Sequence, residues 1–175
     1  PPPRDSSAAS DVYKRQAPIS AYEIVIGYAG AAVSKSLLIS VLILFTSTIF
    51  VDFYIKHPLL MLFLLILISI TFSLFGFIVG IWATNFEKLQ LIPLLIITPL
   101  VFLGGSFYSV EMLPELWQFV TKLNPIFYVI NGFRWSFFGT ADIAITTSLS
   151  FIITFLFICL IIIGLIFKTG YRIKG

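Results

Sequence analysis

Long stretches without a charged side chain dominate this sequence. They are Pro58–Phe86 with 29 residues, Ile143–Phe167 with 25, Leu89–Val110 with 22 and Ser36–Val51 with 16. A helix needs about 20 apolar residues to cross the hydrocarbon core of a bilayer, which is roughly 30 Å thick. Only 11% of the residues are charged, whereas soluble domains carry about 25%. The sequence therefore predicts an all-α polytopic membrane protein with about four transmembrane helices.

Composition also argues against several functions. Cys159 is the single cysteine and His57 the single histidine, so no set of ligands at metal-binding spacing is present and we expect no metal site. A phosphate-binding GxxxxGK[ST] loop is absent, so this chain cannot itself be an ATPase. It also has no cluster of acidic, histidine and nucleophilic residues, and we expect it not to be an enzyme. The formal charge of +3 gives no support to nucleic-acid binding.

The N-terminal part of the chain divides into a tail and a first span. Residues 1–16 are polar and contain no apolar run, and we expect them to be a non-native or disordered tail. The membrane domain then covers residues 17–175. We expect its first span to be centred on Ser36–Val51, with Glu23–Lys35 forming a leading helix. In the next span, Gly76 and Gly80 form a GxxxG-like pair, which indicates either tight helix packing or simple tolerance of glycine.

The run Leu89–Val110 contains residues that interrupt helices. Proline removes a helical hydrogen bond and its ring clashes with the preceding turn, and Pro93 and Pro99 both lie in this run, ahead of Gly104–Gly105. Backbone groups freed in this way are tolerated only against protein or a water-filled cavity, never against lipid. We therefore expect a bent or broken span that lines a pathway.

The segment that follows is amphipathic. In Ser109–Leu123 the apolar residues recur at spacings of mostly three and four, with Glu111, Glu115 and Lys122 between them, which predicts a helix with one wet face. We expect Ser109 to cap its start. Pro114 and Trp117 lie within this segment and Asn124–Pro125 closes it. Together they predict a short helical hairpin at the membrane surface, before the last span.

The distribution of basic residues predicts the topology. Lys168, Arg172 and Lys174 follow the last apolar run without acidic neighbours, which places the C-terminus in the cytoplasm by the positive-inside rule. Four spans put both ends of the membrane domain on that side. The loop Asn85–Lys88 then lies inside, and the hairpin lies outside.

Several short motifs in the second half of the chain resemble the C-terminal signature of ABC-2 type transporter permeases. The resemblance is to the branch that holds nodulation-factor, polysaccharide and drug exporters, and it runs from Ala17 to the C-terminus. The matching elements are Thr98–Pro99, Gly104–Gly105, Phe107–Tyr108, Leu113–Pro114, Trp117, Leu123–Asn124–Pro125 and Gly132–Phe133–Arg134.

The resemblance implies a function and partners. Permeases of this branch have six spans, so this chain would hold spans three to six and lack the first two. It would be the membrane subunit of a bacterial inner-membrane exporter, working as a dimer with a separate ATPase subunit that binds ATP and Mg²⁺. The chain itself would need no cofactor. Its inner loop, formed by Asn85, Phe86, Glu87 and Lys88, would contact the ATPase. An ion-gradient-driven transporter or another four-span membrane protein is the alternative, although such transporters usually place ionisable residues at mid-membrane.

Two sets of residues are candidates for the substrate path and its outer gate. Phe102, Phe107 and Tyr108 either line the gate, with Gly104 and Gly105 as the bend beneath them, or belong to an aromatic belt that faces lipid. Arg134 either contacts an anionic substrate or headgroup, or pairs with Glu111, Glu115 or Asp142. It could also extend its side chain to the outer headgroups. We favour the pair, because charges near a membrane are usually paired.

Overall fold

The structure is a computed structural model that describes residues 21–52, 54–83, 85 and 90–169. All regular structure in these ranges is helical, which confirms the predicted all-α class. The long helices are α2 (Ala21–Phe50), α3 (Pro58–Trp82) and α8 (Ile145–Thr169), and the shorter elements are η1 (Pro93–Ile97), α5 (Thr98–Leu103), η2 (Val110–Met112), α6 (Glu115–Leu123) and α7 (Pro125–Phe138).

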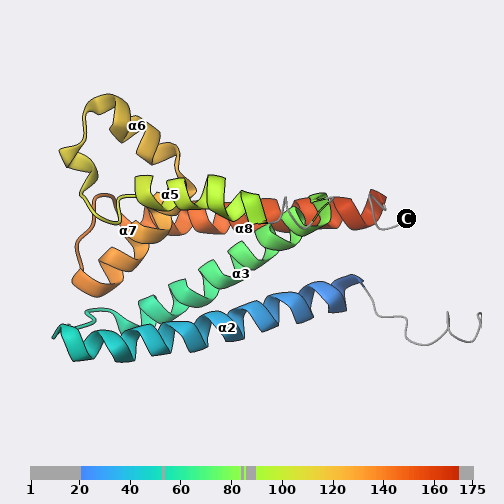
Figure 1. Cartoon of the computed structure of the whole chain (residues 1–175), viewed down its shortest axis with the longest axis horizontal. Coiled ribbons are helices and arrows are strands. Elements are labelled where there is room, and N and C mark those ends of the chain that lie inside the picture. Colours follow the sequence, from blue (N-terminus) through green and yellow to red (C-terminus); the bar gives the residue numbers. More distant parts are fainter. Residues whose placement is uncertain (1–20, 53, 84, 86–89, 170–175) are drawn as a thin grey trace, which may run out of the picture.

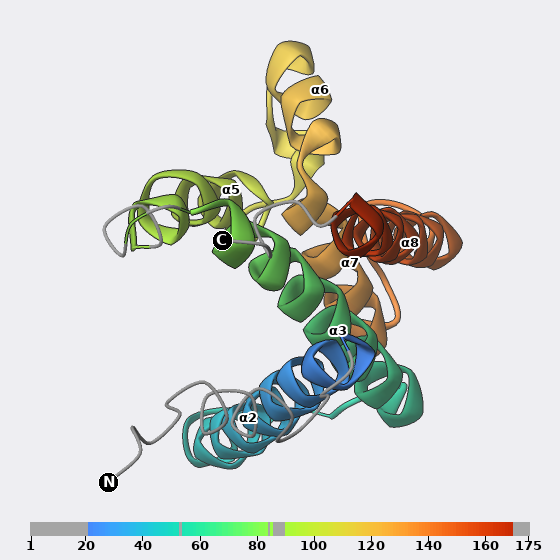
Figure 2. The same cartoon turned by 90° about the vertical axis from the view of Figure 1, so that its right-hand side faces the viewer.

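The three long helices are apolar enough and long enough to cross a membrane. They run along the long axis of the molecule, and the α2–α3 connection, α6 and the α7–α8 connection lie together at one end (Figure 1). The C-terminal end of α8 lies at the other. In the end-on view α3 runs through the middle, between α5 and α8 (Figure 2). The chain therefore passes back and forth between two ends, as a polytopic protein does.

The first span differs from the prediction. Residues 21–50 form a single helix of 30 residues, so the expected leading helix and the first span are one continuous element. No proline or paired glycine lies between Glu23 and Ser36 to separate them. At a rise of about 1.5 Å per residue this helix is roughly 45 Å long, which exceeds the hydrocarbon core.

The predicted break in the third span is confirmed, and its form is a π-helical turn. The apolar helix Gln90–Leu103, here named the broken span, contains the π-turn η1. The N–H and the hydroxyl of Thr98 both reach back five residues to the carbonyl of Pro93. This wider turn accommodates Pro99, whose ring would clash with the carbonyl four residues before it. The helix ends at Leu103, short of Val110, and is only about 21 Å long.

The amphipathic segment is also shorter than predicted. Its α-helix begins at Glu115, after a 3₁₀ turn at Val110–Met112 and an extended Leu113–Pro114. Ser109 makes no capping hydrogen bond, so its predicted capping role is wrong. The turn at Asn124–Pro125 is confirmed, and it starts a further helix, α7, that the apolar pattern alone did not separate.

The core of the bundle lies between α3 and α8. Leu74, Cys159 and Ile163 form a buried cluster there, and Val25 and Ala29 of α2 pack on it. Cys159 is thus a small buried hydrophobe, as expected. The two glycines of the GxxxG-like pair differ: a Cβ on Gly76 would touch the hydroxyl of Tyr28 in α2 at 3.7 Å, whereas Gly80 has nothing within 4 Å. Only Gly76 lies at a helix contact.

Candidate functional site around the α6–α7 hairpin

The broken span ends in a glycine pair whose two members serve different purposes. A Cβ on Gly104 would lie 2.8 Å from Cδ1 of Ile130 and 3.1 Å from the carbonyl oxygen of Leu100. Gly104 therefore allows the end of α5 to approach α7 closely. Gly105 has space around it, but its φ of 82° lies in the left-handed region, which residues with a Cβ enter only at a cost. One glycine is required for space and the other for backbone conformation.

This difference predicts opposite rankings of two substitutions. At Gly105, alanine should cost about 1–2 kcal/mol of unfolding free energy and asparagine less, because asparagine tolerates the left-handed region. At Gly104, alanine should cost about 1–3 kcal/mol through overpacking, and the larger asparagine more. Unfolding in mixed micelles of a mild detergent and dodecyl sulfate measures all four variants. The same rank order at both positions would contradict the assignment.

Asn124 links the hairpin to the broken span. The Gly104 N–H donates to the carbonyl of Val101 and not to that of Leu100, as a regular helix would require. The amide Nδ2 of Asn124 donates to the Leu100 carbonyl instead, at 2.6 Å, while its Oδ1 accepts the N–H of Ile126 at 2.9 Å and caps α7. One buried side chain therefore satisfies a helix end and a helix start.

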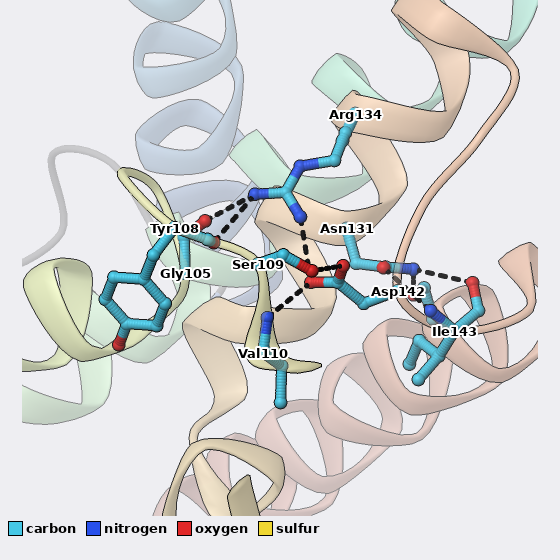
Figure 3. Close-up of polar contacts among 9 residues, drawn as sticks. Gly105, Tyr108, Ser109, Val110, Asn131, Arg134, Asp142 and Ile143 are labelled. Atoms are coloured by element: carbon cyan, nitrogen blue, oxygen red, sulfur yellow. Dashed lines mark hydrogen bonds and ion pairs between the residues drawn. The ribbon is translucent and has the colours of Figure 1, made fainter. Parts of the chain in front are cut away.

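Arg134 is the centre of a polar clamp that joins three segments (Figure 3). Its Nη1 lies 2.8 Å from Oδ2 of Asp142, in the α7–α8 connection, which confirms the favoured prediction of a pair. Its Nη2 donates to the carbonyl of Gly105 and, at 3.4 Å, to that of Tyr108. The guanidinium thus holds the 104–109 loop against α7.

The carboxylate of Asp142 completes this clamp from the other side. It accepts the hydroxyl of Ser109 at 2.7 Å and the N–H of Val110 at 3.3 Å. Ser109 therefore binds Asp142 in the structure, in place of the helix cap that we predicted. The side chains of Arg134 and Asp142 retain 24% and 11% of their surface, so the pair is largely shielded from solvent. We use the name "polar clamp" for Arg134, Asp142 and Ser109.

Asn131 fastens the next segment, one turn earlier on α7 (Figure 3). Its amide nitrogen donates to the carbonyl of Ile143 and the hydroxyl of Ser148, and its oxygen accepts the N–H of Ile143. The residue is 1% exposed. It therefore holds the start of α8 against α7. Sequence reasoning missed it, although its spacing of three from Arg134 places both on one face of a helix.

The predicted gate aromatics come together only in part. The rings of Phe102 and Phe107 stack with centroids 5.7 Å apart, and both are exposed. Tyr108 is half-buried. It lines a hollow of about 410 Å³ with Leu103, Pro114 and Trp117. The structure thus groups the hairpin residues Pro114 and Trp117 with Tyr108.

The α2–α3 connection makes a contact with α7 that the sequence did not predict. The N–H groups of Lys56 and His57 donate to the carbonyls of Phe137 and Ser136 at 3.1 and 2.9 Å. These carbonyls belong to the last turn of α7, where a helix leaves such groups without partners. The imidazole of His57 also stacks on the indole of Trp135, 4.5 Å between centroids. His57 therefore packs on α7, and the described residues contain no group of three metal ligands.

The predicted ATPase contact falls mostly outside the described residues. Asn85 is exposed, just beyond the end of α3, whereas Phe86, Glu87 and Lys88 lie outside the described ranges. The hairpin and its polar clamp lie at the opposite end of the molecule (Figure 1). Asn85 is thus separated from the hairpin and the polar clamp by the length of the helices.

Comparisons with known proteins give the family. Residues 11–138 match the family described as ABC-2 type transporter. The chain is 37% identical over 147 residues to the inner membrane transport permease YadH of Escherichia coli K12, and equally to those of E. coli O157:H7 and Shigella flexneri. These alignments cover 82% of this chain and 57% of each relative, so the chain spans little more than half the length of the curated relatives it matches. No solved structure matches it significantly.

The family match covers most of the chain and includes the broken span, the glycine pair, the hairpin and Arg134. The fold built from three long apolar helices and a broken span agrees with a multi-pass membrane protein. This chain belongs to the ABC-2 type transporter family.

Proposed function

We propose that the protein is the membrane-spanning permease subunit of an exporter, in which a separate ATPase subunit binds ATP and Mg²⁺ and hydrolyses the nucleotide. The 37% identity to an inner membrane transport permease carries this proposal. The catalytic chemistry belongs to the partner, and the permease supplies the path through the inner membrane. Two permease subunits would form that path between them.

The two ends of the helices would have different roles. The inner end, with Asn85 and the residues up to Lys88, is the place where ATP-driven closure of the ATPase would act on the permease. The hairpin at the other end would be the element that moves to release substrate. Since the polar clamp and Asn124 join the 104–109 loop to α7 and the broken span, we expect these parts to move together.

The first test concerns partners. The test uses the permease in the full length that its gene encodes. We expect a neighbouring gene to encode an ABC ATPase that contains GxxxxGK[ST], and this ATPase should copurify with the permease. Replacing Asn85 and Glu87 with alanine should lower the amount of ATPase that copurifies. The matched control is Asp52→Ala, just beyond the C-terminal end of α2 and therefore at the other end of the molecule from Asn85. This substitution should leave the amount of copurified ATPase unchanged. A permease that purifies without any ATPase, under conditions that preserve other ABC exporters, would contradict the proposal.

The second test concerns orientation. In a Cys159→Ser background, a single cysteine at Glu115 or Asp52 should react with a membrane-impermeant maleimide added to intact spheroplasts. A cysteine at Asn85 should react only after the membrane is permeabilised, because we expect this end and the C-terminus to face the cytoplasm. Labelling of Asn85→Cys from outside would reverse the proposed orientation. Labelling of Glu115→Cys and Asp52→Cys from opposite sides would contradict the placement of α6 at the same end of the molecule as the α2–α3 connection (Figure 1).

A further inference from the structure

The continuous helix α2 places a charged side chain far from either end. Lys35 is halfway along Ala21–Phe50, and it is exposed. A separate leading helix would have put this lysine at the edge of the membrane, because the uncharged run begins only at Ser36. Since the leading helix and the first span are one element, the depth of Lys35 follows from the neighbours of α2.

Contacts between aromatic rings give that depth. The ring of Tyr28 lies 5.5 Å from that of Phe77 in α3, which lies 6.3 Å from that of Phe167 in α8. Lys168 follows in the last turn of α8, so Tyr28 is level with the boundary that we expect to face the cytoplasm. Lys35 lies two helical turns beyond Tyr28, about 10 Å further into the membrane. An extended lysine side chain reaches roughly 6 Å, so its amine stays within the hydrocarbon region.

A charged amine at this depth needs compensation. Ionisable residues inside a bilayer are costly, and they face a partner or a water-filled cavity instead of lipid. Among the described residues, Lys35 has no ion pair and its amine has no hydrogen bond. The exposure of Lys35 in a single chain therefore does not indicate contact with lipid. It marks a face that something polar must cover.

A second copy of the chain would not supply the missing charge. The acidic residues of the membrane domain lie near helix ends or in the connections between helices. The nearest along α2 is Glu23, and the distance to Lys35 is about 18 Å of helix. A second subunit in the same orientation carries its carboxylates at the same depths, so none would reach Lys35. Water and dissolved anions would satisfy the amine, whereas lipid and a copy of this chain would not.

The position of Lys35 on α2 favours a path as the source of that water. Tyr28 lies two turns before it and Thr46 three turns after it, so the three polar side chains share one flank of the helix, and all are exposed. We name these three residues the polar flank. Helix α2 packs mainly on α3 and lies at the edge of the bundle (Figure 2). The polar flank is therefore free to border a space between subunits.

We propose that Lys35 faces the water-filled path of the exporter and binds an anionic group of the substrate, a phosphate or a carboxylate. The inference rests on the export function proposed above and adds a substrate class to it. A fixed cation with low-dielectric walls around it raises the local concentration of anions and lowers that of cations. Lys35 would then select substrates by their charge.

A cysteine beside Lys35 measures the charge of the path. In the full-length permease with all other cysteines replaced by serine, Ala31→Cys places a thiol one turn before Lys35, on the same side of α2. Reconstituted vesicles are permeabilised, and the rates of reaction with an anionic and a cationic methanethiosulfonate are compared. Relative to a free thiol, the ratio of these rates should favour the anion by about tenfold. Lys35→Gln should abolish this preference, and Lys35→Arg should keep it.

Two further thiols make the result decisive. Glu115→Cys on the hairpin is the matched control, and its rate ratio should not change with Lys35→Gln. Leu38→Cys, one turn after Lys35, replaces Ala31→Cys if that variant fails to fold. Thiols that react with neither reagent in the folded protein would mean that lipid or a packed helix covers this face, and would overturn the proposal. A ratio that Lys35→Gln leaves unchanged would mean that a fixed carboxylate already neutralises the amine, and would overturn it too.

Lipid composition separates a substrate site from a headgroup site. The anion preference, taken relative to that of Glu115→Cys, should be the same in phosphatidylcholine vesicles with and without phosphatidylglycerol. Its loss on addition of phosphatidylglycerol would assign Lys35 to lipid headgroups and overturn the proposal. The assay needs neither ATP nor the ATPase, so the two proposals can fail separately. An anion preference without a copurifying ATPase would contradict ATP-driven export alone, and a copurifying ATPase without the preference would contradict the role of Lys35 alone.

Discussion

Asp142→Ala should destabilise the protein by about 2–3 kcal/mol, somewhat less than the roughly 3–5 kcal/mol that is lost when one partner of a fully buried ion pair is removed. The expected loss is smaller because the Arg134 side chain keeps 24% of its surface exposed. The substitution removes the counter-charge of Arg134, and the acceptor of Ser109 and Val110 with it. Dodecyl sulfate unfolding measures the loss, and protease cleavage within 104–110 should increase because the loop is released.

Glu111→Ala is the matched control, since it removes the same charge from an exposed position in the same region. It should change the unfolding free energy by less than about 0.5 kcal/mol. In a double-mutant cycle, Arg134→Ala and Asp142→Ala should together cost less than the sum of the single changes. Equal effects of Asp142→Ala and Glu111→Ala, or strict additivity in the cycle, would show that the polar clamp contributes nothing.

The composition and local patterns of the sequence predicted much of the architecture. The uncharged runs located α3 and α8, because a lipid environment requires long apolar helices whatever their neighbours are. Pro93 and Pro99 predicted a break, since the missing N–H is a property of the residue itself. An ion pair of Arg134 was predicted with one of three acidic residues as the partner. Only the fold shows that this partner is Asp142.

Other features depend on contacts between distant parts of the chain, which no local pattern contains. The bonds from Lys56 and His57 to the end of α7 join residues about 80 positions apart, and they use backbone groups that every residue carries. Asn131 and Asn124 act through carbonyls in other segments. Ser109 shows the opposite error: its position suited a helix cap, in which its hydroxyl oxygen would accept a backbone N–H, but in the structure the hydroxyl donates to the carboxylate of Asp142. At this position a tertiary contact overrides the local capping preference.

Asn124→Ala should be at least as damaging as the loss of Asp142, because one side chain makes two separate contacts. Without it α7 loses its N-cap, which is worth about 1 kcal/mol. The carbonyl of Leu100 also loses its partner in an apolar environment, which costs about 1–3 kcal/mol. The expected total is about 2–4 kcal/mol, and the tip of the hairpin should detach from the broken span.

Asn124→Ser separates these contributions. The serine hydroxyl can still cap α7, but the side chain is too short to reach the Leu100 carbonyl. The unfolding free energy of Asn124→Ser should therefore lie between those of wild type and Asn124→Ala. The difference between serine and alanine then measures the cap, and the difference between asparagine and serine measures the bond to the broken span. Lys122→Ala, an exposed neighbour on α6, should have little effect. If serine restored full stability, the bond from Asn124 to Leu100 would contribute nothing, and the broken span would be held by the close contact at Gly104 alone.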